Sequence, residues 1–317
     1  MLRRYGALGG ATILAVVCSG VGLPPPFRPD PPDEAPRWRA LTAEAVAPAA
    51  LGELALGAPQ RVQAPGIAES LGAYAERLQR AEASRGAAVK AWKLRHAPLR
   101  APVPPKEKPR LTSEPGHLTG EGLPPVIVQV PTDQKVIFLT IDDGADKDPR
   151  LLDMLRELEI PVSGFLADEV ARADYGYFRE AQREGYAMHN HSINHREMNR
   201  LSLAEQRAEI CGQQAIMEKE LGHRPVLFRP PYGAYDENTL RAAADCGIEL
   251  VPLWAAEAFP DRIDFGRPDG KFHPGDIVLT HFRGEHEWGA DMTDMVRLLV
   301  DTATEQGFAI ARLEDYL

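Results

Sequence analysis

The chain has 317 residues and a formal net charge of −10, with 44% apolar and 26% charged residues. This composition excludes wholesale disorder, and the acidic balance argues against nucleic acid as a partner, which would need a basic face. Proline and charge divide near residue 125. Residues 1–125 hold eighteen of the 28 prolines and a net charge of +5, whereas residues 126–317 carry −15. Only the second region has the pattern of a folded enzyme.

The N-terminus has the pattern of an export signal. Two arginines, Arg3 and Arg4, precede an uncharged, largely apolar run from Tyr5 to Phe27, which is the order of charge and apolarity in a signal peptide or signal anchor. We assign residues 1–23 to it and expect the protein to be secreted, or attached through its N-terminus to the outer face of the membrane or wall. Lipid attachment at Cys18 is an alternative, although Val17 before it fits small-residue processing poorly.

Residues 24–125 are interpreted as a spacer. Residues 24–36 are dominated by proline, which fixes φ and removes backbone donors. Residues 67–95 contain few helix breakers and predict one helix, and residues 98–125 return to proline and charge. A small binding module is the alternative interpretation of this segment.

From Lys135 onward, strand and helix patterns alternate. The continuous apolar run 136–141 is typical of a strand buried on both faces, and Asp148-Pro149 supplies a helix cap and first-turn proline. Further strands are predicted near 162–166, 186–188, 226–228, 248–254, 277–280 and 308–311. Further helices are predicted near 175–184, 204–221, 237–245 and 292–305, and a capping box (Ser202 to Glu205) opens the second of these. The alternation predicts an α/β fold with a mainly parallel sheet, open or closed, with its site at the carboxyl ends of the strands.

Unusual polar residues follow the first and third of these strands. Asp142 and Asp143 end the first strand, and two adjacent carboxylates there need a cation or hydrogen bonds to offset their repulsion. His191 and His195 follow the strand near 186–188. In a helical turn they would share one face and could meet one metal ion. Taken alone, each pair could be an ordinary polar loop.

Two later strands also end in polar residues. Arg229-Pro230-Pro231-Tyr232-Gly233 follows the strand near 226–228, and Leu279-Thr280-His281 ends the one near 277–280. Taken alone, the first segment could be an ordinary proline-rich turn, and the histidine of the second could be a buried core residue. Four strand ends carrying such groups at one edge of a sheet favour a common site over coincidence.

These four segments, Thr140 to Gly144, His191 to His195, Arg229 to Gly233 and Leu279 to His281, resemble four of the five ordered motifs of polysaccharide deacetylases, the NodB-homology domain of carbohydrate esterase family 4. The resemblance covers residues 126–317. It implies a distorted (β/α) barrel, preceded here by the proline-rich, largely irregular N-terminal segment. It also implies a metal-dependent N-deacetylase acting on an N-acetylglucosamine polysaccharide, either peptidoglycan or a chitin-like glycan.

The resemblance also implies a metal site and a base. Asp143, His191 and His195 would hold one divalent metal ion, zinc in the first instance with cobalt and nickel as alternatives, leaving coordination positions open. Asp142 would be the general base that takes a proton from the attacking water. Arg229 would orient Asp142 and keep it ionised, because a nearby cation lowers the pKa of a carboxyl group.

His281 would be the general acid that protonates the leaving amine, and the Tyr232 backbone N–H would help to hold the developing oxyanion. The resemblance places substrate-binding positions at Pro231, Tyr232, Trp254 and Leu279. His189 matches no ligand position and is left outside the site.

The remaining motif departs from the family pattern. After Trp254 the chain has Glu257 where the family usually has the first aspartate of a pair, and Pro260 occupies the second position. Glu257, or else Asp261 or Asp264 from a shifted loop, would have to tune His281. Because the metal and base positions are intact, we expect a working enzyme with altered specificity.

If Cys18 belongs to the signal, two cysteines remain, Cys211 and Cys246. In an exported protein we expect them to form a disulfide, with two buried thiols as the alternative. We expect a monomer. The alternatives to deacetylation are a small-molecule amide or imide hydrolase on the same fold and a non-catalytic glycan-binding protein.

Overall fold

The computed structural model describes residues 64–317, which form one compact unit. The predicted export signal, Cys18 and the proline-rich run 24–36 all lie outside the described residues. Within the described part of the chain, no helix combines the length and apolarity needed to span a membrane.

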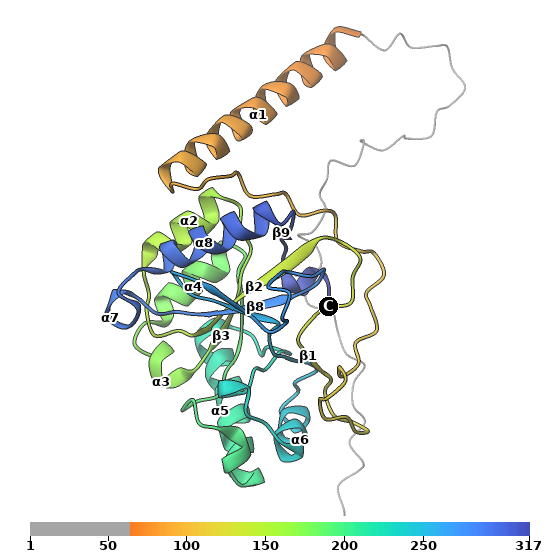
Figure 1. The fold of residues 1–317 in the computed structure, drawn as a ribbon, viewed down its shortest axis with the longest axis vertical. Helices are drawn as coiled ribbons and strands as arrows, with labels where there is room; N and C mark the ends of the chain where they lie inside the picture. Colours follow the sequence, from red (N-terminus) through yellow and green to blue (C-terminus); the bar gives the residue numbers. More distant parts are fainter. Residues whose placement is uncertain (1–63) are drawn as a thin grey trace, which may run out of the picture. The chain divides into compact units, whose positions relative to one another are not determined.

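A parallel sheet forms the centre of the unit (Figure 1). Its strands, in hydrogen-bonded order, are β4 (Ala187–Asn190), β3 (Ser163–Leu166), β2 (Val136–Asp143), β8 (Ile277–His281), β6 (Ala256–Ala258) and the antiparallel β7 (Ile263–Phe265), and β9 (Ala309–Ile310) also pairs with β2. Every residue of β2 is buried, as its uninterrupted apolar run predicts for a central strand.

The sheet continues beyond β4 into an irregular, barrel-like closure. Bridges join Asn190 to Phe228 and Leu227 to Leu250, and the chain then forms β5 (Val251–Pro252), which pairs with β1 (Val126–Ile127). Past β1, the Ile277 amide of β8 donates to the Val128 carbonyl oxygen. The expected distorted α/β barrel is therefore present.

Three strands are markedly shorter than predicted, and one of them is β9, which keeps two of the residues predicted near 308–311. The segment near 226–228 makes only single bridges, and the one near 248–254 reduces to two residues. One of those residues, Pro252, has no N–H to donate to a ladder, and its carbonyl oxygen accepts from the buried Arg229 guanidinium instead.

The helices after the first lie around these strands, whereas the first helix extends away from them (Figure 1). The helices are α1 (Ala64–Ala91), α2 (Pro149–Glu157), α3 (Asp168–Ala171), α4 (Tyr175–Arg183), α5 (Leu203–Leu221), α6 (Glu237–Asp245), α7 (Glu285–Trp288) and α8 (Met292–Glu305), with short 3₁₀ turns at Met198–Arg200, Pro231–Gly233 and Leu313–Asp315. The predicted caps are present. Asp148 accepts from the Arg150 amide at the start of α2, and Ser202 and Glu205 form the capping box of α5.

The segment that follows α1 is fixed to the enzyme-like region. Leu94 is buried in the same apolar cluster as side chains of α2 and α8. Trp92 Nε1 donates to Glu157 at 2.7 Å, and the Glu114 carboxylate accepts from the Val128 amide at 2.7 Å. Residues of the segment 92–125 therefore contact the fold. The boundary at residue 125, with a spacer before it and a catalytic domain after it, stays a prediction.

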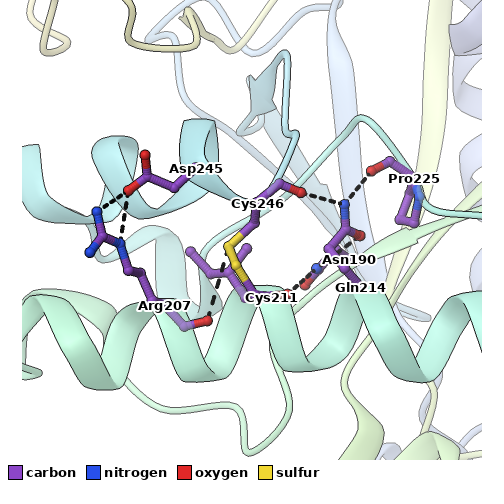
Figure 2. The surroundings of a disulfide bond; sticks show 8 residues. Asn190, Arg207, Cys211, Gln214, Pro225, Asp245 and Cys246 are labelled. Atoms are coloured by element: carbon purple, nitrogen blue, oxygen red, sulfur yellow. Dashed lines mark hydrogen bonds and ion pairs between the residues drawn. A yellow bond between two sulfur atoms is a disulfide. The ribbon is translucent and has the colours of Figure 1, made fainter. Parts of the chain in front are cut away.

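A disulfide joins Cys211 of α5 to Cys246, the residue that caps the end of α6 (Figure 2). The prediction of this bond is confirmed. Gln214, one turn further along α5, donates to the Cys246 carbonyl oxygen at 3.2 Å and to the Pro225 carbonyl oxygen at 2.8 Å. The bond and these hydrogen bonds hold the two helices to the chain that leads into Arg229.

Candidate metal centre and active site

The unusual polar residues meet at one edge of the sheet. Strand register places Asp142 of β2 directly opposite His281 of β8, and Asn190, which ends β4 just before His191, is bridged to Phe228 just before Arg229. Because these strands run parallel, their carboxyl ends share one edge, where sites of α/β folds form.

Asp143, His191 and His195 form a three-residue group that could hold a metal ion, with their potential ligand atoms all within 4.8 Å of one another. Asp143 Oδ1 lies 3.1 Å from His195 Nε2 and 3.6 Å from His191 Nε2. This buried oxygen has no partner in hydrogen-bonding geometry among the described residues. A carboxylate oxygen and two imidazole nitrogens converging in this way fit a divalent metal.

The protonation of His191 supports this fit. Its Nδ1 lies 2.7 Å from the Arg229 carbonyl oxygen, and since a carbonyl can only accept, Nδ1 must carry the proton. Nε2 of the neutral ring then faces Asp143 with its lone pair, the arrangement usual for a metal-binding histidine. Burial, followed by the neighbouring His195, lowers the pKa of His191 to about 3. The ring is therefore neutral, as a ligand must be.

The pKa of Asp143 is lowered, which keeps a carboxylate available as a ligand. Burial works in the opposite direction, but the nearby His195, His191 and His281 outweigh it. On the outer side, His195 Nδ1 lies 3.2 Å from the Tyr232 hydroxyl.

The loop between the two histidines is not the helical turn that their spacing predicts. Ser192 and His195 both have left-handed backbone conformations, with φ of 70° and 48°. The i, i+4 explanation for their convergence is therefore wrong. The two rings approach to 4.9 Å between centroids because the loop folds back on itself.

Asp142 is held by a fully buried arginine. Arg229 Nη1 donates to Asp142 Oδ1 at 2.6 Å, while Nε and Nη2 donate to the carbonyl oxygens of Pro252 and Leu253. The guanidinium also lies 4.3 Å from the centroid of the Phe165 ring. Five donors on a rigid plane allow this several-point fixation, which lysine could not reproduce.

The pKa of Asp142 differs from the sequence expectation. Burial raises it to about 7, although Arg229 opposes the shift. Arg229 lowers the pKa as expected, but loss of water around the carboxyl group outweighs this one cation. A carboxyl group that titrates near neutrality suits a general base.

Glu257 is the one of the three candidate acidic residues that lies near His281, although it makes no hydrogen bond to its Nδ1. Its Oε1 lies 3.6 Å from His281 Nδ1, whereas Asp261 and Asp264 pair with the exposed Arg262. Of the three alternatives left open by the sequence, the structure places Glu257 at the histidine. Burial lowers the pKa of His281 to about 4, with Asp143 opposing it, and burial raises the pKa of Glu257.

The other predicted positions vary in exposure. Tyr232 is 66% exposed with φ of 61°, and its ring contacts His195 at 4.7 Å between centroids. Pro231 is buried, and Trp254 is half-buried against Gly233. Leu279 is only 2% exposed, inside β8. Exposure alone makes Tyr232 the most accessible of the proposed substrate contacts.

His189 lies outside the metal group, whereas Arg283 contacts it. His189 Nε2 lies 2.8 Å from Glu314, away from the metal group, as expected. Arg283, which sequence reasoning missed, donates to Asp143 Oδ2 at 3.2 Å. No strand pattern signals this contact, because β8 ends at His281 and the chain turns there, with the Arg283 amide donating to the His281 carbonyl oxygen at 2.9 Å.

Comparisons with known proteins show which family the chain resembles. The family model described as polysaccharide deacetylase matches residues 129–251. An uncharacterised protein of Streptomyces coelicolor is 44% identical over 199 residues, which cover 62% of this chain and 79% of that protein. A peptidoglycan-N-acetylglucosamine deacetylase of Bacillus cereus is 26% identical over 198 residues, covering 60% and 91%.

Among solved structures, a family 4 carbohydrate esterase pseudoenzyme from Bacillus anthracis superposes with a TM-score of 0.52 at 22% identity, covering 61% of this chain and 69% of that one. This likeness shows the fold. The sequence matches show the class of protein: the chain belongs to the polysaccharide deacetylase family.

Proposed function

We propose that this protein is a metal-dependent hydrolase that removes N-acetyl groups from an N-acetylglucosamine polysaccharide, peptidoglycan or a chitin-like glycan, with one zinc ion held by Asp143, His191 and His195. The observation that carries the proposal is the buried Asp142. Arg229 holds its Oδ1, and its Oδ2 lies 3.6 Å from His191 Nε2. A second carboxylate beside the metal group has no use in a purely structural metal site, and a hydrolase needs it as a base.

A divalent ion bound there supplies Lewis acidity toward a water molecule and toward the acetamide carbonyl. Asp142 takes the proton of the attacking water through Oδ2, since Arg229 fixes Oδ1. Its raised pKa matches this role near neutral pH. The Tyr232 backbone N–H donates toward the carbonyl oxygen as negative charge develops there.

His281 delivers a proton to the nitrogen of the leaving glucosamine. The ring is neutral at rest because burial lowers its pKa, so the proton that it delivers is the one that Asp142 takes from the attacking water. The Glu257 carboxylate at 3.6 Å from Nδ1 stabilises the resulting imidazolium. Trp254 and Tyr232 border the substrate, and the disulfide supports a location outside the reducing cytoplasm, either secreted or attached to the cell envelope.

Asp142→Asn tests the proposal. We expect acetate release from N-acetylglucosamine oligomers and peptidoglycan to fall by about 10²–10⁴-fold, with zinc content by elemental analysis close to one per chain. Asp245→Asn, on the exposed pair with Arg207, is the matched control and should release acetate normally. Undiminished release by Asp142→Asn would remove it from the base role. If the unaltered protein holds zinc but releases no acetate from any glycan, the proposed function fails, and the small-molecule amide or imide hydrolase and the non-catalytic glycan-binding protein remain as alternatives.

A further inference from the structure

The helix that follows the metal-binding loop buries polar side chains where a surface helix usually buries an apolar stripe. Gln206, Glu209, Gln213 and Gln214 of α5 are all buried. Gln213 donates to the Leu166 carbonyl oxygen at the end of β3, and Gln214 accepts from Asn190 at the end of β4 (Figure 2). This face of α5 is therefore directed at the edge of the sheet where the site lies.

Glu209 is the charged member of this face, and it binds the loop between the two histidines. Its Oε2 accepts from the Ile193 amide at 3.0 Å and the Asn194 amide at 2.8 Å, while Oε1 accepts from Asn194 Nδ2 at 2.8 Å. Glu209 is only 5% exposed. Hydrogen bonds from N–H groups to a buried carboxylate are among the stronger ones in proteins.

The loop needs such support. Ser192 and His195 have left-handed backbone conformations, which cost energy for residues other than glycine and persist only where surrounding contacts impose them. Ile193 also packs onto α5 one turn beyond Glu209, where a Cβ on Gly212 would lie 2.5 Å from Ile193 Cδ1. Glu209 and Gly212 thus both hold the loop against α5. Glu209 accepts hydrogen bonds from the loop amides, and Gly212 leaves room for the Ile193 side chain to pack closely on the helix.

We infer that Glu209 is a positioning residue for the metal centre. By holding the amides of Ile193 and Asn194, it sets the directions in which His191 and His195 present their nitrogens. Because its own oxygens are occupied by loop donors, it acts through the backbone and not as a ligand. The inference rests on the proposed function only in taking the two histidines as metal ligands.

The test compares Glu209→Ala and Glu209→Gln with the control Glu218→Ala. Glu218 lies on the same helix, is exposed and pairs with Arg224. Zinc affinity is measured by competition with a chromogenic chelator, and amide hydrogen exchange is followed across residues 191–195. We expect Glu209→Ala to weaken zinc binding by about 10–100-fold and to expose the Ile193 and Asn194 amides. Glu209→Gln, which keeps one acceptor oxygen for the two backbone amides but not the one for Asn194 Nδ2, should fall between Glu209→Ala and the unaltered protein. Glu218→Ala should bind zinc as the unaltered protein does.

A folded Glu209→Ala variant with unchanged zinc affinity and protected loop amides would overturn the inference. If the alanine variant does not fold, Glu209→Asp replaces it. Its shorter side chain should not reach the loop amides, so the Glu209→Asp variant should bind zinc more weakly than the Glu209→Gln variant. Tighter zinc binding by Glu209→Asp than by Glu209→Gln would contradict the positioning role. Neither measurement requires a glycan. If the unaltered protein bound no zinc, the proposed function would fail, while amide exchange would still decide whether Glu209 holds the loop.

Discussion

Replacing both Cys211 and Cys246 with alanine tests how much the disulfide between α5 and α6 stabilises the unit. The bond closes a loop with a sequence separation of 35. In the chain-entropy model, a loop of that length restricts the unfolded chain enough to add about 4 kcal/mol to the free energy of unfolding. For a unit of this size, each kcal/mol shifts Tm by about 2–4 °C. We therefore expect the double variant to melt about 8–16 °C below the unaltered protein.

Thermal unfolding followed by circular dichroism, with and without dithiothreitol, makes the measurement. Reductant should lower the Tm of the unaltered protein toward that of the double variant and leave the variant's Tm unchanged, which separates the bond from any effect of packing. A double variant that melts within about 2 °C of the unaltered protein would refute the reasoning, since it would place the contribution of the bond below about 1 kcal/mol.

Two further predictions concern the acid side of the site. His281→Ala should lower the rate of acetate release by about 10²–10⁴-fold with near-normal zinc content, and loss of zinc instead would make His281 a ligand. Glu257→Gln should lower the rate by about tenfold, the equivalent of one pKa unit of lost imidazolium stabilisation. A rate equal to that of the unaltered protein would show that the 3.6 Å approach of Glu257 to His281 has no part in catalysis.

Local sequence signals predicted the elements that local chemistry determines. The cap formed by Asp148 and the capping box at Ser202 are satisfied by residues within four positions, and the helices they open begin where expected. The buried run of β2 needed no knowledge of its neighbours. From the regular order of such elements, an α/β fold with an open or closed sheet and the edge that carries the site could be predicted, whereas the barrel was implied by the resemblance to polysaccharide deacetylases.

Features that depend on residues distant in the sequence could not be predicted. The spacing of His191 and His195 suggested a helical turn, but Glu209, fourteen residues beyond His195 in the sequence, holds the loop in left-handed conformations. The direction of the Asp142 pKa shift likewise depends on how completely the folded chain excludes water from the carboxyl group. The presence of Arg229 in the sequence does not reveal this burial.

Which of Glu257, Asp261 and Asp264 lies near His281 could also be decided only from the folded structure. In the antiparallel pairing of β6 and β7, Glu257 is opposite Asp264, so their carboxylates lie near each other in the sheet. Only Glu257 lies next to β8, where it is paired with Leu279, and reaches His281. Sequence could name the candidates, and sheet register decided between them.

Acetate release from peptidoglycan by the chelated and then zinc-restored protein tests the central claim most directly. Our account predicts that chelation abolishes release, that one equivalent of zinc restores it, and that Asp142→Asn with the same zinc content does not recover. Release that continues in the fully chelated protein would contradict a reaction that depends on the group formed by Asp143, His191 and His195.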